Sequence, residues 1–188
     1  MYKRQGNIYK ENLPILNYNN SQLTYLKKLD TSSSLVDLRD NFYKLEKLYN
    51  SDPIFYLDSY KFFYNIDLDF AKNIAFDYMN NYRESPILLK AISFIADEIA
   101  DYETESIIYR RLIKIQPENI QAYRDLAFTY VKLGKYNLAS FMYNYIIKSK
   151  KNIDKIPDFQ KIIYAEASNL LLNNFIPNTF SSETIEQL

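Results

Sequence analysis

The sequence has no cysteine and no histidine, and its only glycines are Gly6 and Gly134. Without cysteine and histidine, the chain cannot form disulfides, thiol or imidazole catalytic groups, Ser-His-Asp triads or the common zinc sites. Two glycines are too few for a phosphate-binding glycine loop or for the many tight hairpins of an all-β protein. Carboxylates, amines, phenols and hydroxyls remain, and we expect neither enzymatic activity nor a cofactor.

The chain also has no net charge and no long apolar run. Its 23 Lys and Arg residues balance 23 Asp and Glu residues, which argues against a dedicated partner among nucleic acids or anionic membranes. No run approaches the roughly 20 apolar residues that span a bilayer, so we expect no membrane insertion. Hydrophobic residues nevertheless make up 47% of the 188 residues, enough for the core of one compact domain or a short repeat array.

Apolar residues recur at helical spacing along most of the chain. One such stripe advances in steps of three and four residues: Leu35, Leu38, Phe42, Leu45 and Tyr49. Capping residues stand before Pro53 and before Pro86, a combination that begins a helix. These patterns predict an all-α protein.

The sequence repeats itself at an offset of 34 residues, the period of tetratricopeptide repeats. Residues of similar size align between the copies that start at Pro86 and Ile120: Ile92 with Leu126, Ser93 with Ala127, Ala100 with Gly134, Tyr102 with Tyr136, Tyr109 with Tyr143, Leu112 with Ile146, and Ile113 with Ile147. A weaker copy starts at Asp52. A helical bundle with an accidental register is the alternative.

The copy at 120–151 resembles the tetratricopeptide-repeat family through these positions: Tyr123, Leu126, Ala127, Tyr130, Gly134, Tyr136, Ala139, Tyr143, Ile146 and Ile147. The resemblance implies a short right-handed solenoid of helix hairpins, in which small residues allow close approach and bulky ones fill the space between units. Gly134 stands where the chain reverses, and it needs either a positive φ or room. The copies depart from the pattern at Asp58, Ile66, Glu105 and Lys151.

These patterns divide the chain into an extended lead-in at 1–20, flanking helices at 21–51, three repeats at 52–85, 86–119 and 120–151, a capping helix at 152–175 and a tail at 176–188. Residues 1–5 read Met-Tyr-Lys-Arg-Gln, which resembles the translation of a transposase sequencing adapter. On that interpretation the chain is a fragment of a longer protein. A chance match is the alternative.

A narrower resemblance concerns very large bacterial envelope proteins that carry VIT or alpha-2-macroglobulin-like domains. The segments at 55–58 and 121–127 resemble their repeat region, with flanks at 25–29 and 163–166. This resemblance implies an exported interior piece, in the envelope or periplasm, with no activity of its own. Without it, a cytoplasmic location is the expectation.

The candidate binding residues are those expected on the concave face of the solenoid, which the first helix of each repeat lines. They are Tyr56, Tyr60, Phe63, Lys90, Phe94, Arg124, Phe128 and Lys132. Aromatic rings with a few charges suit an extended peptide or a helix laid in a groove. Packing of these rings against flanking helices, or codon bias toward aromatic residues, is the alternative.

The only dense carboxylate group comprises Asp97, Glu98, Asp101, Glu103 and Glu105. Asp97 and Asp101 lie one turn apart, but no calcium-loop spacing accompanies them, and we interpret the group as a solvated turn. The leading hypothesis is therefore a non-catalytic interaction or scaffold module, which binds a protein, a peptide or neighbouring domains of the same full-length protein. The alternative is an accessory segment that positions a catalytic or export domain absent from this chain.

Overall fold

The computed structural model describes residues 23–29, 34–149 and 158–174, and all regular structure in these residues is helical. The helices are α1 (Leu23–Leu29), α2 (Leu35–Tyr49), α3 (Pro53–Tyr64), α4 (Leu68–Asn81), α5 (Pro86–Glu98), α6 (Tyr102–Ile115), α7 (Ile120–Lys132), α8 (Tyr136–Lys148) and α10 (Phe159–Asn174). The all-α prediction is confirmed. The predicted lead-in at 1–20, the tail at 176–188 and the end of the third repeat at 150–151 lie outside the described residues.

The chain divides into two units, Met1–Phe55 and Tyr56–Leu188. In the first unit, α1 packs against α2, and the ring of Phe55 closes the core. Its centroid lies 5.5 Å from that of Tyr25 and 5.3 Å from that of Phe42. Helix α2 begins after Ser34, whose hydroxyl accepts the backbone N–H of Asp37 as an N-cap. The first unit is thus a small helical element with an aromatic core.

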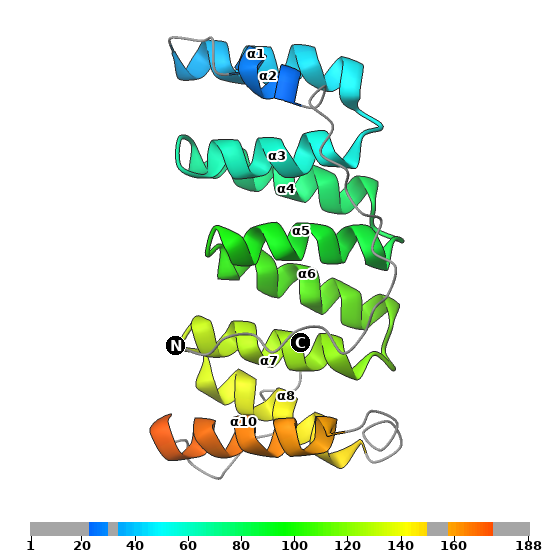
Figure 1. Ribbon diagram of the computed structural model, residues 1–188, viewed down its shortest axis with the longest axis vertical. Helices are drawn as coiled ribbons and strands as arrows, with labels where there is room; N and C mark the ends of the chain where they lie inside the picture. The colour runs from blue at the N-terminus through cyan, green and yellow to red at the C-terminus, as the bar shows by residue number, and fades with distance from the viewer. Residues whose placement is uncertain (1–22, 30–33, 150–157, 175–188) are drawn as a thin grey trace. The chain divides into compact units, whose positions relative to one another are not determined.

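The helices of the second unit stack in antiparallel pairs as a helical-repeat solenoid (Figure 1). Helix α5 packs against α6, α6 against α7, α7 against α8, and α10 against α8. The stacking buries bulky side chains between helices and small ones where the helices approach closely, such as Ala127 and Ala139, which have no exposed surface. No described helix is long and apolar enough to cross a membrane.

Helix starts in the second unit recur at intervals of 34 residues. Leu68, Tyr102 and Tyr136 begin α4, α6 and α8, and Pro86 and Ile120 begin α5 and α7. Most of these starts are capped in the same way, because Asp67, Ser85, Asp101 and Asn119 each accept a backbone N–H three residues further on. The predicted register therefore coincides with the helix boundaries of the structure.

The turns within the last two pairs share one hydrogen-bond pattern. The N–H of Lys135 donates to the Tyr130 carbonyl, as that of Asp101 does to Ala96, which is the Schellman motif. Gly134 and Ala100 occupy its left-handed position with φ of +69° and 61°. A Cβ at Gly134 would have no atom within 4 Å, so the turn requires the positive φ and not the room.

The first pair turns differently. Asp67 donates its N–H to the Phe63 carbonyl, four residues back instead of five. This shorter closure places no residue in the left-handed conformation, and Ile66, which stands at the aligned position, has no positive φ. The departure of Ile66 from the repeat pattern is therefore accommodated by a different hydrogen-bond closure.

Candidate functional site

Three of the eight predicted binding residues are buried, and their expected accessibility to a partner is corrected. Tyr56, Tyr60 and Phe63 of α3 are 3% exposed or less. The Phe63 ring meets the Phe70 ring of α4 at 4.8 Å, and the Tyr56 ring meets that of Tyr78 at 6.4 Å. Tyr56 and Phe63 fill the space between the helices of the first pair and cannot line an accessible surface.

Tyr60 is buried because its hydroxyl has a partner in the next helix pair. The hydroxyl donates to Asp101 Oδ2 at 2.8 Å, and the same carboxylate caps α6 by accepting from the Thr104 N–H and hydroxyl. Burial, reinforced by the charge of Asp101, raises the pKa of the Tyr60 phenol far above its usual range. This contact ties the first pair to the second.

Phe94 and Phe128 occupy the same repeat position as Tyr60, yet their side chains are 42% and 45% exposed. The residue that corresponds to Asp101 one repeat further on is Lys135. Phe94 has no hydroxyl to donate, and the Lys135 ammonium instead pairs with Glu103 at 3.0 Å. The contact that buries Tyr60 therefore has no equivalent at Phe94, and this ring stays at the surface.

An ion pair between α5 and α7 connects the surroundings of the two exposed rings. Lys132, one turn after Phe128, pairs with Asp97, one turn after Phe94. The Lys132 ammonium also lies 4.9 Å from the centroid of the Phe128 ring and 4.7 Å from that of Tyr102, a cation–π arrangement. The two rings thus belong to one surface, which we call the aromatic face and define by Phe94, Asp97, Phe128 and Lys132.

Lys132 also neutralises Glu105, the residue at which the second repeat departs from its pattern. Glu105 is 2% exposed, and its Oε2 lies 3.8 Å from the Lys132 ammonium. The aligned residues are Ala71 and Ala139, both without exposed surface. A buried carboxylate at a position of small residues is thus offset by a lysine from the next pair.

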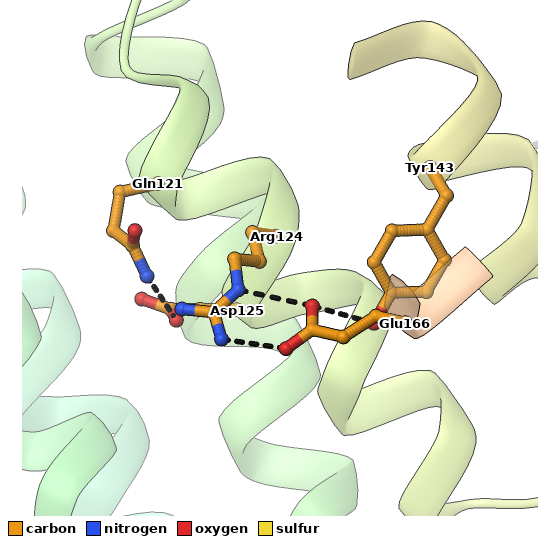
Figure 2. A network of polar contacts seen from close by, with 5 residues as sticks. All are labelled: Gln121, Arg124, Asp125, Tyr143 and Glu166. Carbon is orange, nitrogen blue, oxygen red and sulfur yellow. Dashed lines mark hydrogen bonds and ion pairs between the residues drawn. The ribbon is translucent and has the colours of Figure 1, made fainter. Parts of the chain in front are cut away.

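Arg124, another predicted binding residue, is held by the last helix. Its guanidinium forms a bidentate pair with Glu166 of α10, at 3.0 and 2.6 Å, and the Tyr143 hydroxyl donates to the same carboxylate at 3.3 Å (Figure 2). The hydrogen bonds to Glu166 raise the pKa of Arg124. Nearby, Gln121 donates to Asp125 at 2.8 Å. Arg124 therefore anchors α10, a role that no local sequence signal indicates because 42 residues separate the partners.

Lys90 lies one turn before Phe94 on α5 and is half-buried. The structure therefore brings together Phe94, Phe128 and Lys132, with Lys90 on the same helix as Phe94, and directs Arg124 toward α10. Sequence reasoning did not find Asp97 or Glu166 as the partners of Lys132 and Arg124.

The acidic cluster is divided among separate contacts. Asp97 pairs with Lys132, Glu98 with Lys61 and Glu103 with Lys135, while Asp101 caps α6. Among the described residues, no group of three or more potential metal ligands gathers at one point. These carboxylates act as links between helix pairs.

No model of a known protein family and no curated protein matches this chain. The architecture of the helices and the contacts of the aromatic face therefore carry the functional argument.

Proposed function

We propose that this chain is a non-catalytic protein–protein interaction module built from tetratricopeptide-like repeats. The 34-residue recurrence of helix starts, the Schellman turns at Ala100 and Gly134, and the small residues at 71 and 139 support this family assignment. Solenoids of this kind use the surface of their repeated first helices for binding, and here that surface carries the aromatic face.

The observation that carries the proposal is the exposure of Phe94 and Phe128 at equivalent positions of neighbouring repeats. The same position in the first repeat shows that a buried aromatic residue is compatible with the fold. Two large rings left half in water at the matching sites are a preformed pair of anchors, because aromatic residues dominate the free energy of many interfaces.

The test uses a random peptide library displayed on phage and panned on the immobilised protein. Peptides enriched on the wild type should be lost on the double variant Phe94→Ala/Phe128→Ala and retained on Phe76→Ala, whose ring on α4 is 41% exposed. An enriched peptide should bind the double variant about 30-fold more weakly, since two anchors contribute about 2 kcal/mol or more.

Stability separates binding from packing in the same experiment. Because both rings are half exposed, the double variant should lose only about 1 kcal/mol of unfolding free energy. Equal enrichment on the wild type and the double variant would rule out the aromatic face as the binding surface. A large loss of stability would show that the rings serve as core.

A further inference from the structure

We propose that the partner of the aromatic face is a short, extended peptide segment without charged side chains, which places two apolar residues on Phe94 and Phe128. This inference rests on the proposed function and specifies the chemistry of its ligand. It follows from two features of the surface, namely the pairing of its charges and the number of its exposed rings.

The charged residues at the predicted groove positions already have partners within the chain. Lys132 pairs with Asp97, Arg124 pairs with Glu166, and Glu98 pairs with Lys61. The side chains of the first two pairs are 18–29% exposed, so a charged ligand would have to break a partly desolvated pair to gain a new one. The surface therefore offers a charged ligand little net attraction.

Covering the two rings, in contrast, requires no such exchange. Removing the exposed parts of Phe94 and Phe128 from water is favourable in proportion to the apolar area covered. Phe128 also borders the Lys132 ammonium, which already neutralises Asp97. Apolar side chains can pack on these rings while the ion pair stays intact, and this favours an uncharged ligand.

The number of rings favours an extended segment over a helix. A helix in a groove presents anchors at i, i+3, i+4 and i+7 and needs a stripe of three or four pockets. Here the third equivalent ring, Tyr60, has no exposed surface, which leaves two anchors on neighbouring first helices. Helices in contact lie about 10 Å apart and an extended chain rises about 3.3 Å per residue, so the two apolar residues should be two to four positions apart.

The experiment analyses the peptides that depend on the two rings, meaning those enriched on the wild type and on Phe76→Ala but lost on Phe94→Ala/Phe128→Ala. These peptides should share two apolar residues at that spacing and lack Asp, Glu, Lys and Arg between them. The dissociation constant of a synthetic peptide of this sequence, measured by fluorescence anisotropy, should change less than about twofold between about 0.05 and about 0.5 M salt.

The outcomes separate the two proposals. Peptides that depend on the rings but are rich in charge, with affinity that falls about tenfold or more over this range of salt, would overturn the uncharged ligand and leave the interaction module standing. Enrichment that is the same on the double variant would overturn the aromatic face, and the uncharged ligand with it.

Discussion

At the scale of single residues, Gly134 and Ala100 occupy the same turn position in successive helix pairs, yet only one is a glycine. Both have a positive φ, and this conformation is strained for a residue with a Cβ. Because a Cβ at Gly134 meets no atom within 4 Å, the cost of a substitution there comes from the backbone and not from a clash.

Exchanging the two residue types should therefore have opposite effects. Gly134→Ala should lower the free energy of unfolding by about 1 kcal/mol, and Ala100→Gly should raise it by about 0.5 kcal/mol, since strain relief exceeds the added freedom of the unfolded chain. Urea denaturation of both variants measures these changes. A destabilising Ala100→Gly would show that the methyl group contributes more through packing than it costs in strain.

Glu105 and Lys132 form a second pair of residues whose exchange is informative. Replacing Lys132 by Met leaves the buried Glu105 without the cation 3.8 Å away, and it should lower the free energy of unfolding by about 3 kcal/mol. Adding Glu105→Ala restores the alanine that stands at positions 71 and 139, and it should recover most of this loss. A double-mutant cycle in urea measures the coupling, and strictly additive losses would contradict it.

At the scale of elements, helix α10 is fastened to the solenoid by side chains from two helices. Arg124 of α7 and Tyr143 of α8 both bind Glu166, and α10 also buries Phe159, Ile163 and Leu170 (Figure 2). The polar contact fixes the position of the helix, because a bidentate pair constrains both distance and angle.

Glu166→Gln should loosen α10 without unfolding the pairs that precede it. The variant keeps the shape of the side chain but loses its charge, which weakens a partly buried pair by about 1–3 kcal/mol. Hydrogen exchange should become faster in 159–174 and stay unchanged in α5 and α6. Lys161→Ala is the matched control, since it removes an exposed ion pair from the same helix. Equal acceleration in α5 and α6 would indicate global destabilisation instead.

At the scale of the whole molecule, buried phenols distribute alkaline sensitivity over the helix pairs. Burial raises the pKa of Tyr60, Tyr78 and Tyr143 well above that of a free phenol, and the charges of Asp101 and Glu166 add to the shift at Tyr60 and Tyr143. Above about pH 10 the unfolded chain releases these protons while the folded chain keeps them. The stability linked to these groups is therefore complete below about pH 10 and is lost as the pH rises further.

The free energy of unfolding should accordingly fall with rising pH above about 10, each of these tyrosines contributing about 1.4 kcal/mol per pH unit. Tyr60→Phe removes one such group, so its slope should be shallower by that amount, and its lost hydrogen bond should cost about 1 kcal/mol at neutral pH. Urea titrations at about pH 9, 10 and 11 test this expectation. Parallel slopes for the wild type and Tyr60→Phe would contradict it, because the lysines titrate equally in both.

The sequence by itself determined the helices and their period. Capping residues such as Asp67 and Ser85, the prolines after Asp52 and Ser85, and the turn at Gly134 act over one or two turns of chain, so their effect can be read locally. The all-α class and the helix starts 34 residues apart follow from these signals and agree with the structure.

Only the tertiary structure decided which residues of the repeated face are accessible. Tyr60, Phe94 and Phe128 share one register position, and their exposure depends on whether the next helix pair offers an acceptor such as Asp101. Arg124 likewise resembled a binding residue until α10 brought Glu166 to it across 42 residues. Local signals determine where a helix forms, but the burial and pairing of its side chains depend on which distant helix packs against it.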